Sequence, residues 1–352
     1  MTNNCLVTKL KGVVDNPNIT KLNEFRFKVI AEDNFNGKWL RLVNKSQSEP
    51  MIVTASSPGT FTVDNDSTIR NTYSIQPGGR PTLKFSNATY DVSVIGKYNC
   101  GMFSQQVDTG HNNSLIEIDI DVLKYSPVSS ITGYGNRYMT GNINNFDKSL
   151  FTVLAVEYTN LEGTWDGFTN VNIFGITGSK IGGTLATFPR VATKLDITDN
   201  QRVYGSIDDL ADTTNLTSIS AIRSYNISGG HLESLGRNVN INTIVISELR
   251  DYSGFNGSVE AFVAAQVAAG RTTCTIDNRI LCPWLLYVAT FGGQKYQLRG
   301  YMYLTWDSAS KITIYQGGTG GIAAATRVLA KGATQQEIAA WEQAGKTVTV
   351  IS

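Results

Sequence analysis

The sequence predicts a mainly β protein with an N-terminal β-sandwich-like domain, a repeat solenoid and a small C-terminal α+β segment. Short runs of alternating apolar and polar residues fill the first part of the chain, which is typical of strands. An internal repeat occupies the middle, and the last part combines strand-like runs with a capped helix. The expected domains are residues 1–130, 131–271 and 272–352.

The composition argues against several classes of protein. Lys and Arg number 30 against 29 Asp and Glu, and a net charge of +1 argues against bulk binding to nucleic acid or anionic lipid. Charged residues make up only 17% of the chain, so Gly (33 residues), Asn, Ser and Thr supply its polarity and favour turns and strands. No apolar run is long enough to span a membrane. Residues 1–10 lack the pattern of a signal peptide, so we expect synthesis in a cytoplasm without export by that route.

The N-terminal domain is predicted from strand-like runs separated by turn residues. The run at 24–31 alternates Phe25, Phe27 and Val29 with basic residues, and the hairpin dipeptide Asn36-Gly37 follows it. Further runs of this kind cover 38–43, 50–54, 60–63, 71–75, 81–85, 90–96 and 114–122. Such density of short strands is typical of a sandwich or barrel.

A repeat extends over residues 141–262. Each copy contains Gly-x-apolar-x-x-apolar, and the glycines are Gly141, Gly163, Gly183, Gly205, Gly230 and Gly257. A second pattern, apolar-x-x-apolar-x-apolar, lies between the glycines in constant phase, as in Phe151/Leu154/Val156. Because alternate strand residues share a face, each copy directs an apolar pair inward that it cannot bury alone. The copies must therefore stack.

A period of this length with this pattern resembles a leucine-rich repeat. That resemblance implies an inward polar residue after each strand. Asn200 occupies this place in one copy, and Thr159, Ser179 and Ser224 occupy it in others. Such a solenoid supplies an extended β surface more often than a catalytic pocket.

An amphipathic helix is expected to cover the end of the solenoid. The run SVEAFVAAQVAA at 258–269 begins with Ser258 as N-cap, and Gly270 follows its end.

The C-terminal segment is predicted to contain strands over 284–290, 295–304 and 311–315. A glycine-rich run at 317–321 follows, and then a helical stretch near 323–329. Thr334 and Glu337 form a capping box at the start of a second helix, which Gly345 ends, and 346–351 is the last strand.

We expect no catalytic, cofactor or metal site. The two histidines, His111 and His231, lie in polar turns without a nucleophile motif nearby. The glycine-rich run 317–321 lacks the Lys-Ser/Thr of a phosphate-binding loop, which favours a flexible turn. The acidic row at Glu117, Asp119 and Asp121 is interpreted as a solvated strand face rather than a metal site.

The cysteines predict no zinc site, because none of the four forms a Cys-x-x-Cys pair. Cys5, Cys100, Cys274 and Cys282 are expected to be reduced thiols. Whether Cys274 and Cys282 pair across a hairpin stays open.

Aromatic residues of the repeat are the candidates for a ligand or partner surface. Rows of exposed aromatic side chains suit sugar stacking and protein contacts. The candidates are Trp165, Tyr204, Tyr225 and Tyr252. The alternative for each is core packing or turn filling.

Three stretches carry a resemblance to a known family. They are NNCLVTKLK at 3–11, GSVEAF at 257–262 with AAGR at 268–271, and ATQQEIAAWEQAGKTVTV at 333–350. Together they are similar to structural proteins of bacteriophages that infect Bacteroides, including the crAss-like phages.

This resemblance implies a non-enzymatic virion protein, a fibre or a head or tail decoration, that takes part in attachment or assembly. It transfers no catalytic residues. The implied partners are other virion proteins and further copies of the chain, a trimer by analogy with fibres. The chain has no long coiled coil and no collagen-like shaft, so a fibre would be short, or this would be its tip or base.

Two alternatives stay open. A bacterial surface adhesin with the same solenoid would bind polysaccharide, although the missing signal peptide argues against it. A polysaccharide depolymerase would need a pair of carboxylates, for example Asp166 with Asp208 or Asp209.

Overall fold

The computed structural model is mainly β, as expected, with 45% of residues in strands of several sheets. The structure describes residues 24–29, 39–42, 44, 48–86, 89–95, 102–106, 116–123, 129–247, 249, 255–273, 280–281, 287–318 and 320–352. The chain divides into two compact units, Met1–Asn170 with Gly178–Ile181, and Val171–Thr177 with Gly182–Ser352. The expected three-domain organisation stays a prediction. Among the described residues, no helix has the length and apolarity needed to cross a membrane.

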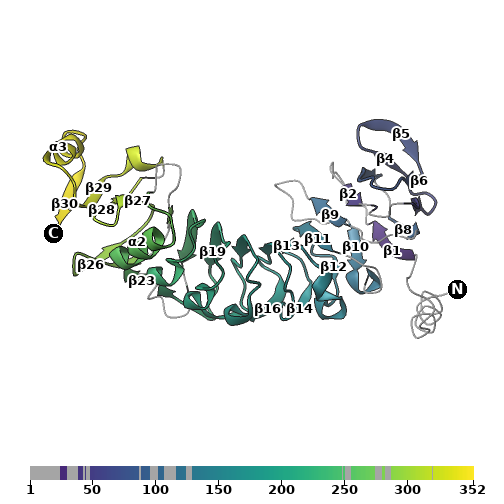
Figure 1. The fold of residues 1–352 in the computed structure, drawn as a ribbon. Helices are drawn as coiled ribbons and strands as arrows, with labels where there is room; N and C mark the ends of the chain where they lie inside the picture. The colour runs from purple at the N-terminus through teal and green to yellow at the C-terminus, as the bar shows by residue number, and fades with distance from the viewer. Residues whose placement is uncertain are drawn as a thin grey trace. The chain divides into compact units, whose positions relative to one another are not determined.

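Two groups of antiparallel strands form the N-terminal part of unit 1 (Figure 1). One group has the order β10-β1-β8-β3-β6, and the other has the order β9-β2-β7-β4-β5. The strands are β1 Glu24–Val29, β2 Trp39–Leu42, β3 Met51–Ala55, β4 Phe61–Val63, β5 Asp66–Arg70, β6 Thr72–Ile75, β7 Thr82–Phe85, β8 Tyr90–Ile95, β9 Met102–Gln106 and β10 Ile116–Asp119. Each predicted run contains a strand, but β10 covers only part of the run 114–122, because residues 120–122 belong to a 3₁₀ helix. The dipeptide Asn36-Gly37 lies outside the described residues, and β5 and β9 were not predicted.

Aromatic side chains from both groups of strands share one core. The ring of Phe85 on β7 lies 6.0 Å from Phe27 on β1 and 6.3 Å from Tyr90 on β8. Phe61 on β4 contacts the same ring at 5.6 Å. All four side chains are buried.

The first copies of the repeat belong to unit 1. β11 (Ser130–Tyr134) pairs in parallel with β9 on one side and with β13 (Val153–Glu157) on the other. β12 (Met139–Thr140) pairs in parallel with β10. The short 3₁₀ helix η1 (Ile120–Leu123) precedes β11. The 3₁₀ helices η2 (Ile143–Asn145) and η3 (Lys148–Leu150) follow β12, and β14 (Glu162–Thr164) follows β13. The apolar positions of these copies are buried: Ile143, Phe146, Phe151, Leu154, Val156, Trp165 and Phe168.

Unit 2 continues the repeat with two sets of parallel strands. The first set, in the order β22-β19-β17-β15, comprises β15 Ile173–Gly175, β17 Lys194–Asp196, β19 Ser218–Ile222 and β22 Thr243–Ser247. The second set comprises the unit 2 part of β16 (Lys180–Thr184), which begins at Gly182, with β18 Val203–Ser206 and β20 Ile227–Ser228. The helices η4 Leu185–Thr187, η5 Ile207–Leu210 and η6 Leu232–Leu235 follow the repeat glycines. The predicted apolar pairs, from Leu185 and Phe188 to Leu232 and Leu235, are buried.

The repeat glycines are needed for both backbone conformation and space. Gly230 and Gly257 have φ values of +131° and +125°, which side-chain-bearing residues rarely adopt. A Cβ atom at Gly257 would meet the Glu233 carboxylate and would lie 2.7 Å from the Leu232 nitrogen. The preceding copy therefore lies too close to the backbone of Gly257 for any side chain to fit at that position.

The predicted helix at 258–269 is confirmed as α2 (Val259–Ala268), and its role as the cap of a solenoid stays a prediction. Ser258 Oγ accepts a hydrogen bond from the Ala261 amide at 3.1 Å, and Gly270 has a φ of +101°. The buried Gln266 side chain donates to the carbonyl oxygens of Gly236 and Asn238, both at 2.8 Å, and thus holds α2 on the preceding copy.

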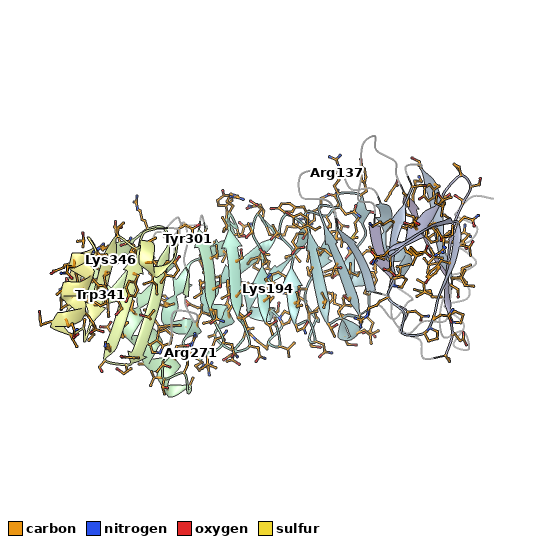
Figure 2. All side chains as sticks on the ribbon, turned by 90° about the horizontal axis from the view of Figure 1, so that it is seen from above. Arg137, Lys194, Arg271, Tyr301, Trp341 and Lys346 are labelled. Carbon is orange, nitrogen blue, oxygen red and sulfur yellow. The ribbon has the colours of Figure 1, made fainter. Side chains whose placement is uncertain are left out.

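The C-terminal strands pack against α2 within unit 2. β25 (Tyr287–Phe291) pairs in parallel with β23 (Phe255–Ser258), which pairs in parallel with β21 (Gly230–His231). The Trp306 ring lies 6.1 Å from Phe262 and beneath the Arg271 guanidinium. Figure 2 shows Arg271 beside α2. The cap helix is thus itself covered by the C-terminal strands.

The last sheet has the order β24-β27-β28-β29-β30 (Figure 1). Its strands are β24 Ile280–Leu281, β27 Met302–Ser308, β28 Lys311–Gln316, β29 Arg327–Lys331 and β30 Thr347–Ile351. Helix α3 (Gln335–Gln343) connects β29 to β30, which run parallel. Its predicted capping box is confirmed, with Thr334 N–H donating to Glu337 at 2.8 Å.

Two C-terminal predictions are wrong. The run 295–304 is not one strand: β26 (Gln294–Leu298) and β27 are separated by a turn at Gly300, whose φ is +79°. The stretch 323–329 is not a helix, because a short 3₁₀ helix, η7 (Ile322–Ala324), is followed by strand β29. Val328, Leu329 and Ala330 are all buried between β28 and β30. A continuous apolar run of this kind fits a central strand as well as a helix.

Candidate functional site

The outward face of the first set of parallel strands in unit 2 is the candidate site. Phe174, Leu195, Ile219 and Ile244 are fully buried, so their neighbours along each strand face outward. The pairing register aligns these neighbours in two rows. One row is Ile173, Lys194, Ser218 and Thr243, and the other is Gly175, Asp196, Ser220 and Val245. We call these rows the Lys194 surface, and Figure 2 shows Lys194 on the sheet.

The carboxylate of Asp196 is held in place by its neighbours. Its Oδ1 accepts a hydrogen bond from the Thr177 hydroxyl at 2.7 Å and from the Thr198 amide at 3.3 Å. Within the described ranges, nothing donates a hydrogen bond to its Oδ2, and no carboxylate pairs with the Lys194 ammonium.

Hydroxyl groups surround this carboxylate. Thr198 Oγ1 lies 2.9 Å from Ser220 Oγ, and Ser218 stands beside Lys194 in the register. Ile173, which is 41% exposed, adds an apolar patch at the other side of Lys194. The Lys194 surface thus offers a fixed acceptor, a cation, hydroxyls and one apolar contact.

The predicted aromatic surface is only partly present. Trp165 is fully buried, so its prediction as a ligand residue is wrong. It fills the first apolar position after Gly163, which points into the core in every described copy. Tyr204 on β18 and Tyr225 before β20 are exposed, at 56% and 38%, but belong to the second set of strands rather than to the Lys194 surface. Tyr252 lies outside the described residues.

An exposed aromatic pair occurs instead in unit 1. The rings of Tyr134 and Tyr158 meet edge to face at 5.7 Å, and each side chain is nearly half exposed. Gly178 gives the Tyr158 ring its space, since a Cβ there would lie 2.6 Å from the ring.

His231 forms an ion pair with Asp208 of the preceding copy. The imidazole Nδ1 lies 2.9 Å from Asp208 Oδ2, and the His231 amide donates to Asp208 Oδ1 at 2.8 Å. The hydrogen bond to Asp208 raises the pKa of His231. Burial acts to raise the pKa of Asp208, but hydrogen bonds from Ser234 and His231 outweigh it and lower that pKa.

This cluster does not have the arrangement of a hydrolase triad. The hydroxyl of Ser234 donates to Asp208 at 2.5 Å rather than to the imidazole. A nucleophilic serine would instead need its hydroxyl hydrogen-bonded to the histidine. His111, like the four cysteines and their open pairing, lies outside the described residues.

Polar side chains also stabilise the turns of the repeat. After four of the repeat glycines, Gly141, Gly205, Gly230 and Gly257, the side chain three positions later accepts a hydrogen bond from a backbone N–H of the following segment. The accepting side chains and their backbone donors are Asn144 and Thr164 N–H at 3.1 Å, Asp208 and His231 N–H at 2.8 Å, Glu233 and Ser258 N–H at 2.8 Å, and Glu260 and Gly292 N–H at 2.7 Å. Sequence reasoning missed this ladder, although the polar residues recur at constant spacing.

Two further carboxylates named from the sequence accept hydrogen bonds from backbone N–H groups, whereas Asp166 is bound through its main-chain carbonyl. Asp209 Oδ2 accepts from the Ser206 amide at 2.8 Å, and Asp119 accepts from the Asp121 amide at 3.0 Å. The Asp166 carbonyl accepts from the Lys148 ammonium at 2.6 Å, and burial lowers the pKa of that lysine. In the part of the chain that is described, no three His, Cys, Asp or Glu side chains converge as a metal site would require.

The expected inward polar residues are buried and hydrogen-bonded. Asn200 donates to the Ile176 carbonyl at 3.2 Å and accepts from the Arg202 amide at 2.8 Å. Ser224 donates to the Ile197 carbonyl at 2.6 Å, and Thr159 donates to the Val156 carbonyl at 2.9 Å. Ser179 and Asn136 are buried at the equivalent places of two other copies. The residue just before each of these five polar residues has left-handed backbone, with φ from +52° to +69°: Gly135, Tyr158, Gly178, Asp199 and Arg223.

No protein-family model matches the chain, and neither a curated protein nor a solved structure is detectably similar to it.

Proposed function

We propose that the chain is a non-enzymatic structural protein of a bacteriophage particle. It is a fibre or a head or tail decoration that attaches the particle to a bacterial polysaccharide. The short stretches 3–11, 257–262, 268–271 and 333–350, which resemble virion proteins of Bacteroides phages, are the reason for proposing a phage particle. Localisation in the virion and contact with other virion proteins follow from it.

The proposed architecture is a leucine-rich-repeat-like solenoid between a β-sandwich-like domain and an α+β segment. The parallel strands in register, with buried apolar pairs and inward polar residues, support the solenoid. The core shared by Phe27, Phe85 and Tyr90 supports the sandwich.

The observation that carries the attachment function is the Lys194 surface. Its ionisable side chains, Lys194 and Asp196, have opposite charges, so the surface has no net charge that would attract a charged polymer over a neutral one. Asp196 Oδ2 accepts hydrogen bonds from sugar hydroxyls, while Lys194 and the serines donate to sugar oxygens. We therefore propose a neutral hexose polymer as the ligand. Tyr204 and Tyr225, on the second set of strands, remain proposed contacts for a ligand or partner.

Binding of the full chain to a glucan, a mannan and a galactan tests this proposal, with alginate as the polymer of acidic sugars. We expect binding to at least one neutral polymer and about tenfold weaker binding by Asp196→Ala and by Lys194→Ala, since each removes a hydrogen bond to a charged group, worth ~1.4 kcal/mol. Asp91→Ala and Lys295→Ala are matched controls, because both residues are exposed on strands elsewhere.

Two outcomes contradict parts of the proposal. Binding to none of the neutral polymers contradicts the ligand class, and equal binding by Asp196→Ala contradicts the site. The virion role is tested separately by mass spectrometry of purified particles, where absence of this chain from the particle contradicts it.

A further inference from the structure

Strand β30 forms an edge of the last sheet and lacks the features that normally prevent strands from pairing between molecules. Its five residues, Thr347–Ile351, contain no charge and no proline, and its register with β29 is continuous. Val350 is 58% exposed. Natural edge strands are usually protected by charges, prolines or bulges.

Two other edge strands among the described residues do have such protection. β5 carries Asp66 and Arg70, which form an ion pair, and its register with β4 is interrupted. β26 carries the exposed Lys295.

The direction of the backbone groups shows which residues face the open side. Thr347 donates its N–H to the Thr326 carbonyl at 2.9 Å, toward β29. Since successive residues of a strand direct their N–H and C=O groups to opposite sides, those of Val348 and Val350 point away from β29. No described strand pairs with that side.

We propose that β30 pairs with β30 of a second copy of this chain, antiparallel and about a two-fold axis at Thr349. Val348 of one copy then exchanges both backbone hydrogen bonds with Val350 of the other, and the two valine side chains cover each other. The two-fold axis makes the edge self-complementary, and residues 347–351 carry no charges that would repel the same residues of the second copy. This association does not depend on the proposed ligand.

The mass of the full chain in solution, measured by light scattering over a dilution series, tests the pairing. We expect two copies of the 38.3 kDa chain for the natural sequence and one copy for Val350→Lys. Ile69→Lys is the matched control, because Ile69 is 71% exposed on the protected edge strand β5 and its change leaves the mass at two copies. Thermal unfolding of each variant shows whether it is folded.

A cross-link identifies the strand directly. In the proposed pair, Thr349 opposes its own copy as a non-hydrogen-bonded pair at a Cα separation of about 4.5 Å, which suits a disulfide. Thr349→Cys therefore forms a covalent dimer on oxidation, whereas the natural chain and Thr347→Cys do not. A single-copy mass at every concentration overturns the proposal. The proposal is also overturned if the natural chain has a larger mass, Val350→Lys leaves that mass unchanged, and Thr349→Cys forms no covalent dimer.

Discussion

The imidazole of His231 lies 2.9 Å from the carboxylate of Asp208, one copy earlier in the repeat. The same carboxylate also accepts from the His231 amide and the Ser234 hydroxyl. One acidic side chain therefore connects the side chain and the backbone of the next turn.

The ion pair predicts that stability decreases as the pH rises. The folded-state pKa of His231 is raised above the ordinary value of 6.5, so its contribution is fully present below pH 6.5. It is lost as the pH rises through the raised folded-state pKa. An NMR titration should give a His231 pKa above 6.5 in the natural chain, and this pKa should fall toward 6.5 in Asp208→Asn. With His111 as the second histidine, His111→Asn assigns the resonances; an unchanged pKa in Asp208→Asn would contradict the pairing.

Gly257→Ala should destabilise the protein more than Gly270→Ala. Both glycines have positive φ, so both changes carry backbone strain of about 1–2 kcal/mol. At Gly257 the new Cβ also meets Glu233 and the Leu232 nitrogen, whereas at Gly270 no atom lies within 4 Å. Urea unfolding of the two variants measures the difference. Equal losses would show that the close approach of the two copies relaxes freely.

Gln266→Leu should lower the free energy of unfolding by about 1–3 kcal/mol. Gln266 is fully buried, and the change leaves the carbonyls of Gly236 and Asn238 without this donor. Gln336→Leu, at an exposed position of α3, is the control and should change little. Hydrogen exchange should show faster exchange along α2 in the Gln266 variant only; slow exchange there would mean that packing alone holds the helix.

Acid should weaken the start of α3. Hydrogen bonds from Thr334 and Lys311 lower the pKa of Glu337 to about 2. A lowered folded-state pKa means that the contribution is present above the ordinary carboxyl pKa of 4.5 and is lost as the pH falls toward 2. Thr334→Ala should raise the Glu337 pKa measured by NMR, while Thr347→Ala should not. A Glu337 that titrates near 4.5 in the natural chain would contradict the capping box.

The repeat core was predictable because it depends on local spacing. The apolar residues after each glycine, the N-cap Ser258 and the capping box at Thr334 all follow from short-range pattern, and the structure confirms them. The prediction for Trp165 was wrong because it ignored this spacing. Trp165 occupies an apolar position of the repeat, which predicts burial, but it was assigned to a ligand surface because it is aromatic.

The candidate site depends on contacts between copies, which sequence spacing does not specify. Period two places Lys194 and Asp196 outward, but only the register brings Thr177 of the preceding copy to the Asp196 carboxylate. The strand β29 was missed for a related reason, since burial on both faces removes the alternation that identifies strands.

The residues with left-handed backbone before the buried polar side chains limit which substitutions the repeat tolerates. Glycine suits this backbone best, and other residues cost roughly 1 kcal/mol there, yet Tyr158, Asp199 and Arg223 occupy it. Contacts between copies offset this cost, because the Arg223 guanidinium donates to the Asp199 carboxylate at 2.5 and 2.7 Å and the Tyr158 ring packs against Tyr134 at 5.7 Å. A strained backbone position thus serves as an attachment point between neighbouring copies, and a change at Asp199 should be tolerated only together with a compensating change at Arg223.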